Sequence, residues 1–237
     1  MSLRAGSPIS VRCTLIPVVS VFLALLSCGL PSLAAAQERT GFWIGFGLGA
    51  GSTGISADNV AGRISGEDRD EGAVGDLGLG WTLNHQLLLG VELKVNTSAQ
   101  PSEGKTFSTF SMTLADWLGT LTFYPSRSSG FFVKAGAGVS HVDFDIEWPE
   151  TIESPEFATL VFVDGPRFRG TVGKGFGLMT GAGYDLRLGR GFSLVPELTF
   201  RYGRPGDIDV GGITQFKNWT HNTIDAKASI VFHQTRK

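Results

Sequence analysis

The chain has 237 residues, a formal net charge of −2, 33 glycines and a charged fraction of only 18%. Soluble globular domains usually carry about a quarter charged residues, so this composition argues against an ordinary soluble domain, while the length suits one good-sized domain. There is no basic excess, and we therefore expect no nucleic-acid partner.

The N-terminal segment has the three parts of a cleaved signal peptide. Arg4 and Arg12 supply positive charge without any acidic residue, residues 15–30 form an apolar core, and residues 34–36 are three alanines that suit cleavage. The apolar core is shorter than the ~20 residues that a membrane-spanning helix needs. Lipidation at Cys28 is a less favoured alternative, because the apolar stretch continues beyond this cysteine.

We accordingly predict a signal peptide over residues 1–36 and one domain over residues 37–237. Both cysteines, Cys13 and Cys28, lie in the signal peptide, so the remaining domain has no disulfide. An exported domain without disulfides needs another source of stability. A closed β-barrel provides one, because closure pairs the backbone groups of every strand.

Eight segments of the domain alternate apolar and polar residues with a period of two, which predicts β-strands. They cover residues 42–50, 73–84, 87–96, 109–124, 131–144, 175–188, 192–202 and 220–232. The first segment is the clearest, because glycines at odd positions alternate there with apolar residues. The domain contains no run of 18 apolar residues, so we expect no transmembrane helix.

The predicted connections alternate between short and long. The short ones cover residues 84–86, 126–129 and 189–191, and the long ones cover about 52–72, 97–108, 145–174 and 203–219. Short turns on one rim and long loops on the other are typical of outer-membrane barrels. The apolar segment 157–163 lies in the longest connection, where it either extends a strand hairpin or packs against neighbouring loops.

The polar face of the strands combines glycines with six acidic and five basic residues. They are Asp76, Glu92, Lys94, Asp116, Lys134, Asp185, Arg187, Glu197, Arg201, Asp225 and Lys227. The interior of an eight-stranded barrel is just wide enough for side chains, and glycines leave room for long charged ones. We therefore expect the apolar face to meet lipid and the charges to face the lumen. There they should pair, because an unpaired buried charge is costly, and all of them except Asp76 and Asp116 are predicted to form one connected network.

Aromatic residues gather near both ends of the strands, as they do where a barrel crosses the two membrane interfaces. The belt near the short turns would consist of Phe42, Trp81, Phe123, Tyr124, Phe131, Phe192 and Phe232. The belt near the long connections would consist of Phe107, Phe144, Phe176, Tyr202 and Trp219.

The chain resembles the small outer-membrane β-barrel family, which includes the transmembrane domain of outer-membrane protein A and its short eight-stranded relatives. The resemblance rests on the signal peptide, the opening strand Phe42–Gly51, the turn Tyr124-Pro125-Ser126 and the strand Leu194–Tyr202. It implies an all-β fold, an eight-stranded antiparallel up-and-down transmembrane barrel in the bacterial outer membrane. Such barrels usually end on an aromatic residue, whereas five residues follow Phe232 here.

No catalytic, cofactor-binding or metal-binding arrangement emerges. The histidines lie in four separate segments without metal-ligand spacing; they are His85, His141, His221 and His233. Ser140 and His141 are adjacent and so point to opposite strand faces, and no acid accompanies His221 and Thr223. We expect no enzyme, metal or cofactor, and keep a barrel enzyme that modifies outer-membrane lipid as an alternative.

These observations favour a monomeric outer-membrane protein with a structural or surface-interaction role and a lumen plugged by paired charges. Both chain ends fall on the short-turn rim, which predicts periplasmic termini. The partners would be outer-membrane lipid and an extracellular or host ligand that meets the long connections. Two alternatives stay open: a soluble lipocalin-like barrel with an apolar ligand inside, and a narrow porin-like pore.

Overall fold

A computed structural model describes residues 39–59, 62–65, 69–101, 109–147, 151–154, 157–161, 167–189, 191–210 and 213–234. The predicted signal peptide, residues 1–36, lies outside the described residues. Within them, no helix is long and apolar enough to cross a membrane.

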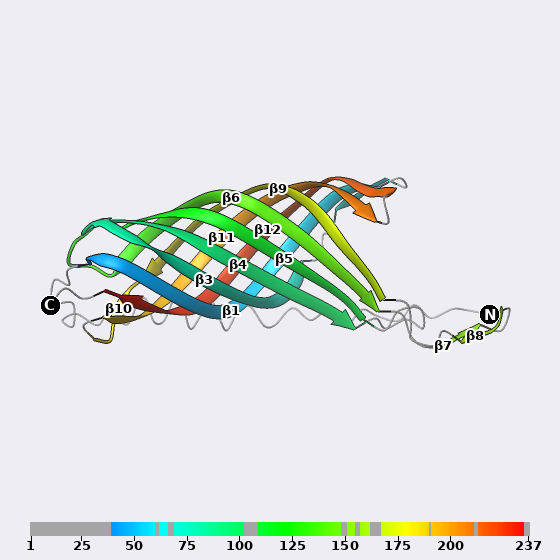
Figure 1. Cartoon of the computed structure of the whole chain (residues 1–237), viewed down its shortest axis with the longest axis horizontal. Coiled ribbons are helices and arrows are strands. Elements are labelled where there is room, and N and C mark those ends of the chain that lie inside the picture. The colour runs from blue at the N-terminus through cyan, green and yellow to red at the C-terminus, as the bar shows by residue number, and fades with distance from the viewer. Residues whose placement is uncertain are drawn as a thin grey trace, which may run out of the picture. The chain divides into compact units, whose positions relative to one another are not determined.

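Eight long strands form a closed antiparallel barrel, which confirms the predicted fold class (Figure 1). They are β1 (Gly41–Asn59), β3 (Asp70–Asn84), β4 (Leu87–Pro101), β5 (Thr109–Phe123), β6 (Phe131–Glu147), β9 (Arg167–Tyr184), β11 (Phe192–Val210) and β12 (Ile213–His233). Each strand pairs with its neighbour in the chain, and β12 pairs with β1 to close the sheet, from Trp43 opposite His233 to Asn59 opposite Phe216. Closure leaves no free sheet edge, which lipid would not tolerate.

Four short strands accompany the barrel strands. β2 (Gly62–Ser65) pairs with the end of β1, and β10 (Leu186–Arg187) continues the line of β9 and pairs with β11. β7 (Thr151–Ser154) and β8 (Phe157–Val161) pair with each other in a separate two-stranded sheet. Residues 157–161 of the apolar segment singled out in the sequence thus form a local hairpin with residues 151–154.

The strands are longer than predicted, with 15 residues in β3 and 21 in β12. About ten residues suffice to cross the hydrocarbon region at a tilt, so the extra length lies beyond it. The prediction of long loops was therefore wrong over much of 52–72 and 203–219, where β1, β3, β11 and β12 continue. The signal was missed because the outward side chains described there, such as Ser56, Glu71 and Arg204, are polar and interrupt the apolar alternation that marks a strand.

The strand predicted over residues 175–188 is interrupted at Asp185. On the neighbouring strand, β11 pairs with β9 from Glu197 onward and with β10 at Leu194 and Ser193. The gap in this ladder faces Pro196, which has no backbone N–H to donate. The Asp185 backbone N–H instead donates to the Gly130 carbonyl in the nearby turn, at 2.8 Å.

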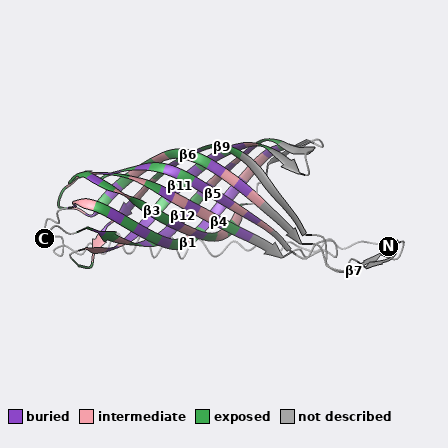
Figure 2. Cartoon of the chain, in the orientation of Figure 1, coloured by how far each residue is buried: buried purple, intermediate pink, exposed green. Residues whose placement is uncertain are grey.

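Along the barrel strands, buried residues alternate with exposed ones (Figure 2). The exposed ones include many large apolar side chains, whereas the charged residues selected from the sequence are buried or half-buried. The outward residues Leu89 and Val91 are 50% and 48% exposed, whereas Glu92 and Lys94 on the same strand are 1% and 0% exposed. A soluble barrel that holds an apolar ligand would need the opposite orientation. The lipocalin-like alternative is therefore excluded by the direction of the side chains.

Two members of the predicted aromatic belts lie inside the barrel instead. Tyr124 and Trp219 are only 4% and 5% exposed, because they continue the inward phase of β5 and β12. Phe42, Trp81, Phe123, Phe131 and Phe232 are exposed near the short turns, and Phe176 and Tyr202 are exposed further along the barrel. The side chains of Phe107 and Phe144 lie outside the described residues.

Candidate functional site

The barrel lumen gathers all eleven charged residues that the sequence analysis selected. Nine of them are buried, and Lys134 and Arg187 are half-buried. Among the described side chains, their ion pairs fall into three groups, whereas the sequence analysis expected one connected network.

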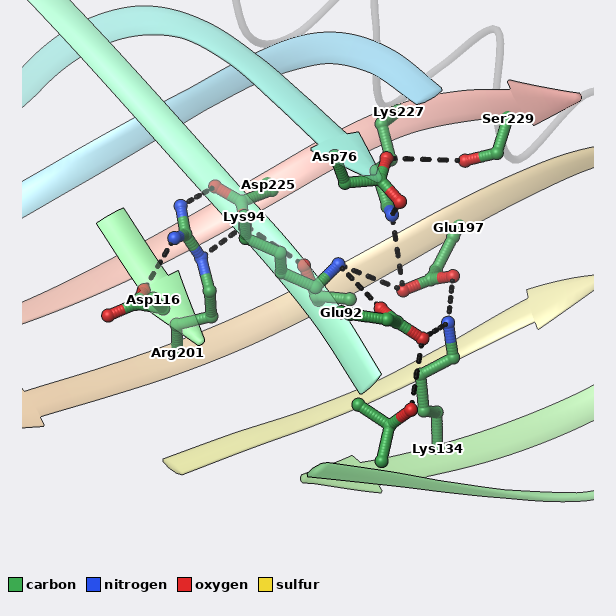
Figure 3. A network of polar contacts seen from close by, with 12 residues as sticks. Asp76, Glu92, Lys94, Asp116, Lys134, Glu197, Arg201, Asp225, Lys227 and Ser229 are labelled. Atoms are coloured by element: carbon green, nitrogen blue, oxygen red, sulfur yellow. Dashed lines mark hydrogen bonds and ion pairs between the residues drawn. The ribbon is translucent and has the colours of Figure 1, made fainter. Parts of the chain in front are cut away.

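The central ion cluster consists of Asp76, Glu92, Lys94, Lys134, Glu197 and Lys227 (Figure 3). Lys134 Nζ lies 2.8 Å from carboxylate oxygens of both Glu92 and Glu197. Lys94 Nζ lies 3.4 Å from Glu92 and 3.5 Å from Glu197. Lys227 Nζ lies 2.7 Å from Asp76 and 3.7 Å from Glu197, so Glu197 meets all three lysines.

The Arg201 cluster consists of Arg201, Asp116 and Asp225. The guanidinium of Arg201 donates through Nε and Nη2 to both oxygens of Asp225, at 2.8 and 3.1 Å, and through Nη1 to Asp116 at 2.6 Å. Thr199 also donates to Asp225, at 3.0 Å. The planar fork of arginine suits this two-point contact with a carboxylate and fixes β5, β11 and β12 relative to one another.

The rim cluster lies at the short-turn rim and consists of Arg39, Asp185 and Arg187. Arg39 Nε and Arg187 Nε lie 3.3 and 3.2 Å from Asp185. Arg39 also donates to the Ser129 carbonyl at 3.1 Å and stacks 3.6 Å above the ring of Tyr124.

Together the three clusters balance their charge. The central ion cluster pairs three acids with three bases, the Arg201 cluster has two acids and one base, and the rim cluster has one acid and two bases. Arg39 supplies the sixth base, which sequence reasoning missed because it precedes the first strand. Its position just before Phe42, at the short-turn rim, could have indicated that Arg39 reaches into the lumen.

Apolar side chains occupy the lumen on both sides of the central ion cluster and the Arg201 cluster. The lower apolar cluster, near the short turns, is Trp43, Leu88, Tyr124, Phe132 and Val195, with Val231 packed against it. The upper apolar cluster, in the extended part of the barrel, is Ala57, Met112, Leu114, Val142 and Trp219, with Ile55 packed against it. A cavity of about 50 Å³ lies between the lower cluster and the central ions. Small-molecule sites usually need several hundred Å³, so this space suits only a few waters.

Ser140 and His221 form a pair that the sequence analysis did not foresee. Ser140 Oγ lies 2.9 Å from His221 Nε2 across the lumen, and both residues are almost fully buried. The absent side chain of Gly203 leaves the space that the imidazole fills, because a Cβ there would overlap it. The sequence analysis considered Ser140 only together with its chain neighbour His141. The contact with His221 joins β6 and β12 across the barrel and depends on the strand register, which the sequence does not show.

No group of three or more His, Cys, Asp or Glu side chains in the described part of the chain could hold a metal ion. His85 lies exposed in the β3–β4 turn, and His141 points outward from β6. His233 is buried at the short-turn rim. The structure thus brings only one histidine, His221, into hydrogen-bond contact with a hydroxyl among these described residues.

A family model described as "Outer membrane protein beta-barrel domain" matches residues 20–232. The chain belongs to this outer-membrane β-barrel family. Membership places the protein in the bacterial outer membrane, where the exposed apolar face of the barrel meets lipid.

Several solved structures of outer-membrane proteins are similar to this chain at low sequence identity. Neisserial surface protein A is 15% identical, with 83% of this chain and 99% of that chain covered and a TM-score of 0.48. Ail of Yersinia pestis, in complex with the heparin analogue sucrose octasulfate, is 8% identical over 81% and 99%, with a TM-score of 0.48. OprG of Pseudomonas aeruginosa is 14% identical over 84% and 99%, with a TM-score of 0.47. No curated protein sequence is significantly similar to this chain.

Proposed function

We propose that this outer-membrane barrel has a plugged, non-conducting lumen and serves as a rigid stand for a surface-interaction region. The observation that carries the proposal is the layered lumen, in which the central ion cluster and the Arg201 cluster lie between two apolar clusters. The rim cluster adds a further layer of paired ions at the short-turn rim. Buried ions held by several partners resist hydration, and eight strands leave little free cross-section.

The orientation in the membrane is part of the same proposal. Arg39 and Gln234, the first and last described residues, both lie at the short-turn rim, where Gln234 N–H donates to the Phe42 carbonyl at 2.8 Å. Short turns of such barrels face the periplasm and longer connections face outside. The opposite rim, extended by β1, β2, β11 and β12, would then meet an extracellular ligand or host partner, and the barrel would act as a monomer.

Conductance in planar lipid bilayers tests the plug. The protein without residues 1–36 should give no large, stable conductance. Replacing Arg201 and Lys134 together by alanine removes one base from each of two clusters and should produce frequent brief openings. A large steady conductance of the unaltered protein would contradict the plug.

Labelling of single cysteines in intact cells tests the orientation. The chain after residue 36 contains no cysteine, so Lys217→Cys and Ser128→Cys report on opposite rims without background. Both positions are exposed. A membrane-impermeant maleimide should label Lys217→Cys only, and labelling of Ser128→Cys alone would reverse the orientation.

A barrel enzyme that acts on lipid is a second candidate, because Ser140 and His221 have the contact expected of a nucleophile and its base. Their nearly complete burial argues against substrate access. Lipid A acyl chains from cells that express the protein, the Ser140→Ala variant or neither would decide between the two. An unchanged acyl profile would remove the enzyme.

A further inference from the structure

On three neighbouring strands, the outward face changes from an apolar or aromatic residue to a cationic or imidazole side chain within two residues. The pairs are Val139 and His141 on β6, Phe176 and Lys174 on β9, and Tyr202 and Arg204 on β11. Two strand residues span about 6.8 Å, so all three polar side chains start at a similar height above exposed apolar ones. We call His141, Lys174 and Arg204 the basic ledge.

The sheet register places the three members of the basic ledge next to one another. His141 lies directly opposite Lys174 in the β6–β9 ladder. Arg204 lies opposite Phe176 in the β9–β11 ladder and is therefore a diagonal neighbour of Lys174. Directly opposite residues have Cβ atoms about 5 Å apart, and diagonal ones about 7–8 Å apart. An anion about the size of a phosphate fits between side chains at this spacing.

The cations of the basic ledge form no ion pair with a described side chain. Lys174 is exposed and has no ion pair among them, and the one described contact of Arg204 is with the Asn218 amide oxygen, at 3.2 Å. Asp207, the acid nearest along β11, accepts the backbone N–H of Asn218 at 3.0 Å. Asp143 shares the outward face of β6 two residues beyond His141, but it forms no ion pair with Lys174 or Arg204 among the described contacts. Lys174 and Arg204 therefore repel each other without a bound counter-ion, and an external anion would stabilise the arrangement.

We propose that the basic ledge binds the phosphate of an anionic lipid in the outer leaflet, with the acyl chains of that lipid against Val139, Phe176 and Tyr202. This inference rests on the proposed orientation, which puts the ledge at the outer interface. A charged headgroup above apolar chains matches the vertical order of the residues. The guanidinium of Arg204 supplies a planar fork for phosphate, Lys174 supplies a point charge, and His141 supplies an N–H donor.

Native mass spectrometry of the detergent-solubilised protein without residues 1–36, titrated with lipid A that carries two phosphates, tests this site. The unaltered protein should retain one lipid A in preference to its dephosphorylated form. Lys174→Gln with Arg204→Gln should weaken retention at least tenfold. Both positions are exposed, so the circular dichroism spectrum should stay unchanged.

The matched control is Lys217→Gln with Arg127→Gln, which removes the same charge from exposed positions outside the ledge. It should leave retention within about twofold. Equal weakening by both double variants, or equal retention of phosphorylated and dephosphorylated lipid, would overturn the proposal. Reversed cysteine labelling of Lys217 and Ser128 would instead reject the orientation, whatever the result of the lipid titration.

Discussion

The lower and upper parts of this barrel have opposite polarity. In the lower part, near the short turns, the outward residues are apolar and most lumenal ones between the two apolar clusters are charged, polar or glycine. In the upper part, the lumen holds the upper apolar cluster, and the outward side chains are polar or charged; they include Ser56, Glu71, Thr97, Thr113, His141, Lys174, Arg204 and Asn222. The same eight strands carry both patterns.

The inversion shows that the medium outside the barrel decides which residues face outward. Lipid excludes charges from the outer face, so the lower part places them inside, where they require partners. Water accepts polar side chains, so the upper part folds as a soluble protein does, with apolar residues inside. In the proposed orientation, the level at which the pattern reverses marks the outer interface, and it coincides with the basic ledge.

Loss of a single charge from the central ion cluster should lower the free energy of unfolding more than any other change considered. Glu197→Gln keeps the shape of the side chain but removes the charge that meets Lys94, Lys134 and Lys227. Removing one partner from a buried ion group costs about 3–5 kcal/mol, and we expect this loss in the free energy of unfolding in lipid vesicles. The exposed control Lys217→Gln should change it by less than about 0.5 kcal/mol. Similar small changes in both variants would show that the lower lumen is hydrated.

The upper apolar cluster should behave as the core of a soluble protein. Leu114→Ala leaves a cavity among fully buried residues and should cost about 2–5 kcal/mol in urea unfolding. Its neighbour Thr113 lies on the outward face of the same strand, and Thr113→Ala should stay within about 0.5 kcal/mol. Equal effects at the two positions would remove the distinction between inside and outside in the upper part.

The outer face should tolerate charge only above the reversal level. Val91→Arg places a cation on the lipid face of β4 and should cost about 2–4 kcal/mol. Thr113→Arg, outward on β5 in the upper part, should cost less than about 0.5 kcal/mol. Unfolding titrations in vesicles give both values, and a tolerated Val91→Arg would mean that this face does not meet hydrocarbon.

The Ser140–His221 pair should contribute least to the free energy of unfolding. Ser140→Ala removes one buried hydrogen bond and should lower the free energy of unfolding by about 1 kcal/mol. The lipid profile of expressing cells should not respond to this variant. A changed lipid profile with an unchanged free energy of unfolding would indicate that Ser140 and His221 are catalytic rather than structural.

Sequence alternation was sufficient to predict the eight strands and their phases in the lower part. Asp116 was expected to face the lumen from the segment 109–124, and the structure has it buried there with its neighbour Trp117 exposed. The eleven lumenal charges followed from the same alternation. This worked because lipid and lumen impose a sharp difference between successive residues.

The upper part could not be predicted in the same way. The outward residues Arg204 on β11 and Thr220 on β12 are polar, so the outward apolar pattern of the lower part stops there although both strands continue. Trp219 was assigned to an aromatic belt because the predicted strand began at residue 220, whereas β12 begins at Ile213 and Trp219 shares the inward phase of Asp225 and Lys227. The contact between Ser140 and His221 and the division of the charges into three clusters depend on register around the whole barrel, which local spacing does not encode.

The direction of alternate side chains on β4 is the most direct test of the lipid-facing assignment. Spin labels at cysteines introduced one at a time for Leu89, Val91, Glu92 and Lys94 would be compared in bilayers for collisions with oxygen and with a water-soluble nickel complex. Labels at 89 and 91 should meet oxygen readily and nickel rarely, while labels at 92 and 94 meet neither. High nickel accessibility at 89 and 91 would contradict the membrane-facing orientation of the barrel.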